Sequence, residues 1–298
     1  MPRIIEEIPD GNLLALVIAR MVNFSIEHGN GDGSPLGYVF LGMILESRFG
    51  DYDAGFRFGK VGVDLVEQLG LHRFKAHAYL NFGNAINPWT RHVRTSLDLL
   101  RSALNAAHES GHLTFAAYSY TNLISAHLAA GAPLPEVQHF AEAGLAFVQQ
   151  TGFGTGVDLI LGHLGLVRAL RGLTPNLSSF NYAAFDETRF EQHLAANPGL
   201  AMSTCWYWIR KLQAYVLADD RVAALSAASE AERLLWTSPG FLVVADYHFY
   251  AALACAAYYG TSSGDERGEL LTKLKAHQKQ IAAWAGTCAE NFQNRYFL

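Results

Sequence analysis

GDYDAGFRFGKVGVDLVEQLG, residues 50–70, predicts one helix that follows a tight turn. Gly50 is expected to end the preceding segment, and Asp51 or Asp53 can cap the new helix by accepting its free backbone N–H groups. A second feature of the stretch is a face made only of glycine, at helical spacing: Gly55, Gly59 and Gly62. A glycine inside a helix costs about 1 kcal/mol relative to alanine. We therefore expect another helix to approach this face very closely.

The small-residue face returns along the chain at an offset of 41 residues. The matching positions are Ser96, Leu100 and Ala103, then Val137, Ala141 and Gly144, and, after a doubled gap, Ala224, Ala228 and Ala231. Chance is the alternative, because alanine is common in helices, but glycine-containing turns precede three of the four copies. A period between about 20 and 50 residues is typical of stacked supersecondary units. The sequence therefore predicts an all-α superhelix of tetratricopeptide-like helix pairs, a solenoid.

Hydrophobic periodicity predicts helices over most of the chain and no convincing strand. The segment 157–171 is apolar nearly all round, so it should be central and buried. Residues 172–186 lack the repeat spacing and are expected to form a loop. We thus expect a single array over residues 1–298 with an irregular unit at about 172–197. The expected helices are 12–28, 36–48, 51–69, 74–84, 92–109, 114–130, 136–150, 157–171, 187–196, 200–218, 222–236, 242–259 and 266–285.

Composition narrows the classes of partner and compartment. Half of the residues are hydrophobic and the net charge is −5, with no basic run, which gives no support for nucleic acid as a partner. An acidic N-terminus with Glu6, Glu7 and Asp10 argues against a signal peptide, and Arg20 interrupts an apolar run too short to span a membrane. Three scattered cysteines suggest buried thiols in a reducing compartment. We therefore expect a cytoplasmic protein with no membrane partner.

One motif suggests an enzyme. His108, Glu109 and His112 match the H-E-x-x-H pattern of zinc hydrolases, which requires a continuous helix that places both histidines on one face. Gly111 lies where the repeat register ends the helix, so the two histidines should point in different directions. We expect no catalytic residues, no bound metal and no cofactor, and a metal-dependent hydrolase stays as the alternative.

Clusters of polar and aromatic residues lie in or beside the first helix of several pairs, which commonly lines the concave face of such arrays. The alternative is that they are struts between helices. Arg210 is the best candidate to bind a carboxylate or phosphate, because its planar fork can donate two hydrogen bonds. The candidate binding residues are Asn84, Tyr118, Asn122, Trp206, Arg210 and Tyr247.

Eight motifs spread over the chain carry a family resemblance. They are NPWTRHVRTSLDLLRSAL, LTFAAYSYTNLISAHLAAG, EVQHFAEAGLAF, LRGLTP, FDETRFEQHL, CWYWIRKLQA, LLWTSP and YHFYAALA. Together they resemble the helical-repeat region of very large bacterial signalling proteins. In that family a serine/threonine kinase-like domain and an AAA-type ATPase precede the repeats, and a GAF domain and a sensor histidine kinase follow. The resemblance implies that this chain is the repeat region alone, since it contains no Walker motif, kinase catalytic loop or phospho-acceptor histidine box.

These observations together predict a non-catalytic sensor or scaffold module of a bacterial two-component ATPase–kinase signalling protein. Its concave face would bind a protein segment, from kinase or ATPase domains of the same or a partner chain, or a small-molecule signal. Binding would shift the packing between repeats. A purely structural spacer between catalytic domains is the further alternative.

Overall fold

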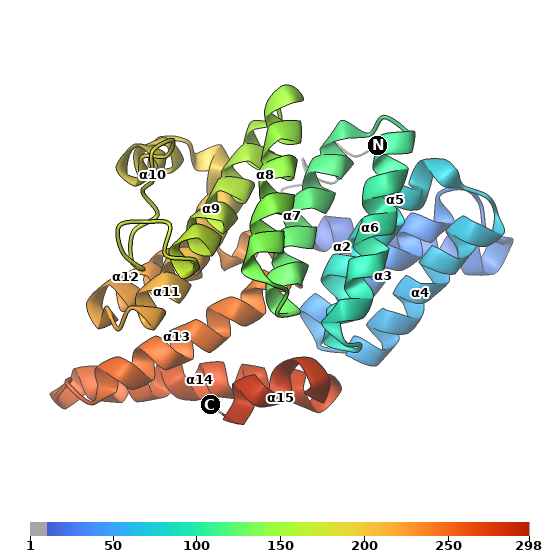
Figure 1. Ribbon diagram of the computed structural model, residues 1–298. Coiled ribbons are helices and arrows are strands. Elements are labelled where there is room, and N and C mark those ends of the chain that lie inside the picture. Colours follow the sequence, from blue (N-terminus) through green and yellow to red (C-terminus); the bar gives the residue numbers. More distant parts are fainter. Residues whose placement is uncertain (1–10, 298) are drawn as a thin grey trace. The chain divides into compact units, whose positions relative to one another are not determined.

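The computed structural model describes residues 11–297, and it divides into two compact units, residues 11–119 and 120–297 (Figure 1). The described residues contain 14 α-helices and no strand, apart from one isolated antiparallel bridge between Tyr182 and Phe185. The prediction of an all-α fold is therefore confirmed. The acidic residues Glu6, Glu7 and Asp10, on which the prediction about targeting depends, lie outside the described residues.

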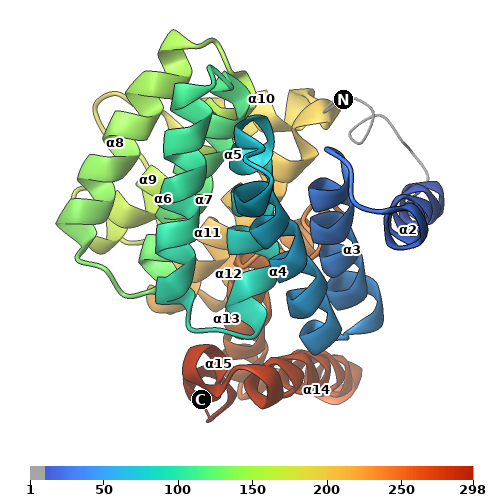
Figure 2. The ribbon, with the colours of Figure 1, turned by 90° about the vertical axis from the view of Figure 1, so that its right-hand side faces the viewer.

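The first unit consists of antiparallel helices joined by short turns. α3 packs along α4 more extensively than any other pair in the described chain, and the two lie side by side in both ribbon views (Figures 1 and 2). A π-helical turn, η1 (Phe82–Ile86), and a 3₁₀ turn, η2 (Asn87–Trp89), follow α5 and were not expected from the sequence. The helices are α2 (Gly11–His28), α3 (Ser34–Phe49), α4 (Tyr52–Gln68), α5 (His72–Asn81) and α6 (Val93–Glu109).

The second unit begins within α7 (Leu113–Ala129). Its central helix is α9, which is buried along most of its length, as its apolar sequence predicts. α12 ends at Glu232, four residues before the expected end, and α15 follows a break at Cys288 that the hydrophobic pattern did not reveal. The remaining helices are α8 (Leu134–Gln150), α9 (Gly154–Leu170), α10 (Glu187–Ala196), α11 (Ala201–Leu217), α12 (Arg221–Glu232), α13 (Val243–Tyr259), α14 (Gly264–Thr287) and α15 (Ala289–Phe297).

The 41-residue period is visible in the helix boundaries. α4, α6 and α8 are each 17 residues long and begin 41 residues apart, at Tyr52, Val93 and Leu134. α7 and α9 are also 17 residues long and begin 41 residues apart. The same interval separates three glycines in the left-handed conformation that end helices, Gly70, Gly111 and Gly152. The repeat of helix pairs therefore exists in this part of the chain.

The glycine face of α4 permits the close helix contact that the sequence predicts. A Cβ atom at Gly62 would lie 2.4 Å from the carbonyl oxygen of Pro35, and one at Gly42 would lie 2.6 Å from the carbonyl oxygen of Gly55. Both distances are shorter than any real contact, so the two backbones meet where only glycine fits. The corresponding small residues on α6, α8 and α12 are likewise buried.

Gly55 also leaves room for a buried carboxyl group. A Cβ atom at Gly55 would lie 2.3 Å from Cγ of Glu46, whose residue is only 3% exposed. Neither carboxyl oxygen of Glu46 has a hydrogen-bond partner among the described residues. Burial raises the pKa of Glu46 to about 10, because a charged carboxylate loses its hydration there. Glu46 is therefore protonated in the folded protein at neutral pH.

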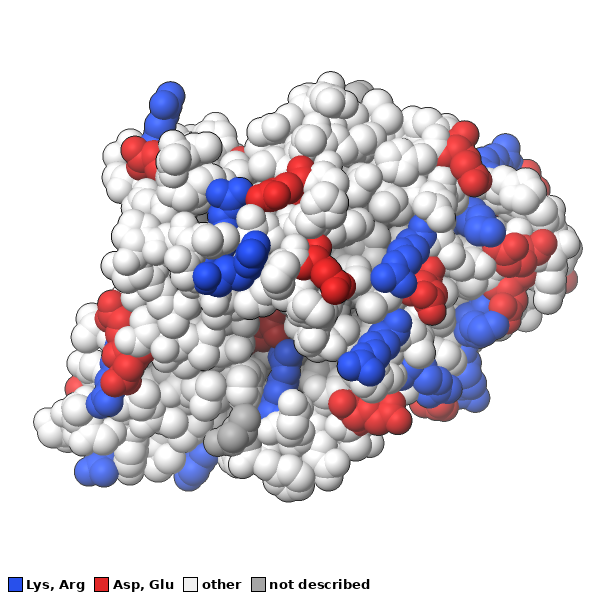
Figure 3. Space-filling model, in the orientation of Figure 1, with Lys and Arg blue, Asp and Glu red and all other residues white. Residues whose placement is uncertain are grey.

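Charged side chains are interspersed on the face seen in Figure 3, where acidic and basic residues alternate over large uncharged areas. Several of them form exposed pairs one helical turn apart, for example Arg57 with Asp53 at 3.3 Å. Among the described residues, none of the helices combines the length and the hydropathy needed to cross a membrane.

Candidate binding site

The irregular segment between α9 and α10 forms one wall of an open groove of about 1140 Å³ in the second unit. Leu161 of α9 and one face of α10 complete the lining. The residues that line it are Leu161, Gly172, Leu173, Thr174, Pro175, Asn181, Tyr182, Ala183, Ala184, Phe185, Asp186, Arg189, Phe190 and His193. The expectation of a non-helical segment here is confirmed, since no helix lies between Leu170 and Glu187.

Local chemistry explains why this segment is not helical. Gly172 takes the left-handed conformation, with φ of 69°, and ends α9. The Asn176 side chain then accepts a hydrogen bond from the Ser178 N–H at 3.0 Å, a local turn that competes with a helix. At the far end, Asp186 caps α10 by accepting from the Arg189 N–H at 3.0 Å. The segment is therefore fixed at both ends by its own sequence.

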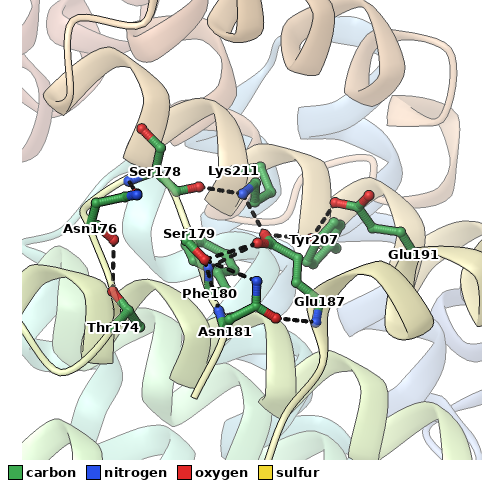
Figure 4. Close-up of polar contacts among 10 residues, drawn as sticks. All are labelled: Thr174, Asn176, Ser178, Ser179, Phe180, Asn181, Glu187, Glu191, Tyr207 and Lys211. Atoms are coloured by element: carbon green, nitrogen blue, oxygen red, sulfur yellow. Dashed lines mark hydrogen bonds and ion pairs between the residues drawn. The ribbon is translucent and has the colours of Figure 1, made fainter.

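A buried ion pair fastens the segment to α11 (Figure 4). Lys211 of α11 pairs with Glu187 and donates a hydrogen bond to the carbonyl oxygen of Ser178 at 2.6 Å. Glu187 in turn accepts from the Phe180 N–H at 3.1 Å and from the Tyr207 hydroxyl at 3.0 Å. Burial, together with Glu187, raises the pKa of Tyr207, so its hydroxyl remains a donor. Since each partner is satisfied, this network holds the groove wall in one conformation.

The groove combines an aromatic surface with one unpaired cation. The rings of Tyr182 and Phe185 stack at 5.6 Å, and Phe185 contacts Phe190 at 5.1 Å. Arg189 is exposed at the groove and forms no ion pair with any described residue. His193, at the same groove, lies 3.3 Å from the carboxylate of Asp158. Such a surface can bind an extended peptide through flat apolar contacts and can bind a carboxylate through the guanidinium.

Arg210, expected to anchor a ligand, lies in the interior with 1% of its surface exposed. Its guanidinium contacts Asp246 at 2.8 Å, and Arg295 contacts the second oxygen of the same carboxylate at 2.9 Å. Burial alone would raise the pKa of Asp246, but the two guanidinium groups lower it below its ordinary value. The carboxylate that the Arg210 fork binds is therefore one of the chain's own.

The other candidate binding residues are also mostly enclosed. Trp206 is buried and donates from its indole nitrogen to Ser238 at 2.8 Å, and Asn84, Asn122 and Tyr247 are buried, whereas Tyr118 is half-buried. These positions resemble struts more than the wall of an open groove. Their role in binding stays a prediction. The open groove was missed because its aromatic residues lie in a segment without helical spacing.

The H-E-x-x-H match is interrupted as its glycine predicts. α6 ends at Glu109, Gly111 has a φ of 70°, and His112 precedes α7, where its ring contacts the ring of His77 at 5.4 Å. The two histidines therefore do not share one helical face. Among the described residues, no three His, Cys, Asp or Glu side chains are grouped as a metal would require.

A serine–histidine pair lies in the interior of the second unit. Ser125 Oγ is 2.7 Å from His163 Nε2, and His163 Nδ1 is 2.7 Å from the carbonyl oxygen of Leu159. Nδ1 therefore carries the proton, and Nε2 accepts. Burial, reinforced by the charge of Arg210, lowers the pKa of His163 to about 3. Both side chains are buried away from the groove, so the pair fits the interior network rather than a surface site.

Comparisons with known proteins place the chain in a signalling context. No family model matches it. A stretch of 163 residues, 54% of the chain, is 24% identical to "Hybrid signal transduction histidine kinase G" of Dictyostelium discoideum. The matched part is only 5% of that protein, so the chain corresponds to a small fraction of this relative. The similarity supports a distant relationship to a signalling protein.

Proposed function

We propose that this chain is a non-catalytic helical-repeat module of a signalling protein and that it binds a protein segment in the groove beside α10. The observation that carries the proposal is the groove itself: an aromatic wall held by the buried Glu187–Lys211 pair, with Arg189 unpaired at its edge. A prearranged wall reduces the entropy that binding must overcome. The peptide that fits has aromatic or apolar side chains next to a carboxylate. Kinase or ATPase domains of the same or a partner chain are the expected source of the segment.

The 24% identity to a hybrid histidine kinase supports the signalling part of the proposal. The sequence resemblance to the repeat region of bacterial kinase–ATPase proteins points to a cytoplasmic scaffold or sensor within such a system. A structural spacer and a metal-dependent hydrolase are the competing functions. A spacer would not require an aromatic groove with an unpaired guanidinium, and the interrupted histidine motif disfavours the hydrolase.

Selection from a displayed library of random peptides tests the proposal. We expect enriched peptides to carry Asp, Glu or a free C-terminus beside an aromatic residue. Arg189→Glu should weaken binding of the best peptide at least about tenfold, equivalent to about 1.4 kcal/mol, measured by fluorescence anisotropy. Arg94→Glu, the same charge change at an exposed position of α6, should leave affinity unchanged. No enrichment, or equal loss in both variants, would favour the spacer.

A further inference from the structure

A second, smaller pocket lies between α12, α13 and α14 in the second unit. Its volume is about 170 Å³, room for a molecule of only a few non-hydrogen atoms. None of the groove residues takes part in it. The residues that line it are Leu225, Ala228, Ser229, Glu232, Tyr247, Ala251, Cys255, Glu266, Glu269, Leu270, Lys273 and His277.

The floor of the pocket consists of buried polar groups that lack partners. Tyr247 is 2% exposed and Cys255 is 3% exposed. Neither the Tyr247 hydroxyl nor the Cys255 thiol makes a hydrogen bond with any described residue. Beside them, His277 contacts the Tyr247 ring at 5.5 Å and pairs with His248 at 3.0 Å between their Nδ1 atoms. A buried hydroxyl without a partner is costly, so the pocket offers an unused hydrogen-bonding position.

The rim of the pocket is acidic. Glu232, Glu266 and Glu269 are exposed there with a single opposing cation, Lys273. No ion pair joins any of these four side chains to another described residue. Glu232 raises the pKa of Tyr247, Cys255 and His277 through its charge, secondary to burial in each case, so its carboxylate acts on the whole floor. The rim therefore carries an excess of two uncompensated negative charges over the polar floor.

Apolar side chains form the remaining walls, among them Leu225, Ala251 and Leu270. An ammonium group fits the carboxylates, the free hydroxyl and the face of the tyrosine ring, which attracts cations. A short hydrocarbon chain fits the apolar walls. From this arrangement we propose that the pocket binds a short aliphatic amine, and that a diamine matches the charge of its rim best. The site is separate from the peptide groove and does not depend on it.

Isothermal titration with 1,4-diaminobutane, and with 1,4-butanediol as the uncharged analogue, tests the assignment. We expect saturable binding of the diamine and none of the diol. Glu232→Gln should weaken diamine binding about tenfold. Lys273→Gln should strengthen it, because it removes the only cation at the rim. Glu230→Gln, on the same helix but paired with Arg233, serves as the matched control and should change nothing. Each variant is first shown to unfold at the temperature of the parent protein.

Three results would overturn the proposal. They are no saturable binding at millimolar diamine, equal binding of the diol, and equal loss of affinity in the Glu232→Gln and Glu230→Gln variants. Weaker binding after Lys273→Gln would also overturn it, because that result would mean that the pocket holds an anionic group. Failure of this experiment leaves the peptide groove untouched, since the two sites share no residue.

Discussion

Glu46 shows how one residue can set the pH response of the first unit. Its pKa is about 10 in the folded protein and 4.5 ordinarily. Below pH 4.5 the carboxyl is protonated in both states and contributes no pH dependence. Between pH 4.5 and 10 the unfolded chain releases the proton and the folded chain keeps it. Stability therefore falls as pH rises, by about 1.4 kcal/mol per pH unit.

Glu46→Gln is expected to remove this slope and to raise the free energy of unfolding at pH 8 by about 3 kcal/mol. Urea unfolding at pH 6, 7 and 8, followed by circular dichroism, measures both quantities. Glu109→Gln, at an exposed position of α6, should leave the slope as it is. A parallel slope in Glu46→Gln and the parent protein would show that Glu46 is not buried and protonated.

Arg210 marks the limit of prediction from sequence at this scale. Its position on one helical face with Trp206 was evident, because both lie on α11 at helical spacing. Asp246 and Arg295, which neutralise and enclose it, lie on α13 and α15. No local pattern relates residues so far apart in the chain. A polar side chain on a helix can equally face a ligand or a distant partner, and only tertiary packing decides between them.

At the scale of elements, the contact between α3 and α4 depends on the absence of side chains. Gly55→Ala places a Cβ atom 2.3 Å from Cγ of Glu46 and 2.9 Å from the carbonyl oxygen of Gly42. The second neighbour is backbone and cannot move alone. We expect a loss of about 3 kcal/mol in the free energy of unfolding, at the upper end of overpacking effects.

Gly268→Ala provides the matched control for this helix contact. Gly268 lies inside α14, and a Cβ atom there meets nothing within 4 Å. Because alanine favours a helix over glycine, this change should stabilise the protein by about 0.5–1 kcal/mol. Thermal unfolding of both variants gives the signs directly. Stabilisation by Gly55→Ala would mean that the two helices are further apart than described.

The helices themselves could be predicted well, whereas the groove could not. Glycine ends, the Asp51 cap and the 41-residue offset are local features, and they gave the type and order of nearly every helix. The segment 172–186 has no such period, and its conformation depends on Glu187 meeting Lys211 of another helix. Its aromatic residues therefore gave no warning that they line an open surface.

For the whole molecule, buried neutral histidines predict sensitivity to acid. Burial lowers the pKa of His163 and His248 to about 3 and lowers that of His277, all in the second unit. Above pH 6.5 these groups are neutral in both states. As pH falls below 6.5 the unfolded chain binds protons that the folded chain does not, so stability is lost by about 1.4 kcal/mol per unit for each histidine.

Acid titration from pH 7 to 4, followed by circular dichroism, is expected to unfold the second unit cooperatively. His248→Gln should move the midpoint to lower pH, because it removes one of the sites that take up a proton on unfolding. His139→Gln, at an exposed position of α8, should not move the midpoint. If both variants shift alike, the buried histidines are not the cause of acid unfolding.

The left-handed glycines at Gly70, Gly111 and Gly152 have a consequence for how genes of this kind can grow. Unequal recombination between two copies of the unit gains or loses 41 codons at once. Such an event inserts or removes a complete pair of helices together with its turn, and it leaves the phase of all other helices unchanged. Intermediate lengths would instead rotate every later helix away from its partner. Inherited variation in the length of such chains should therefore be stepwise, in whole units.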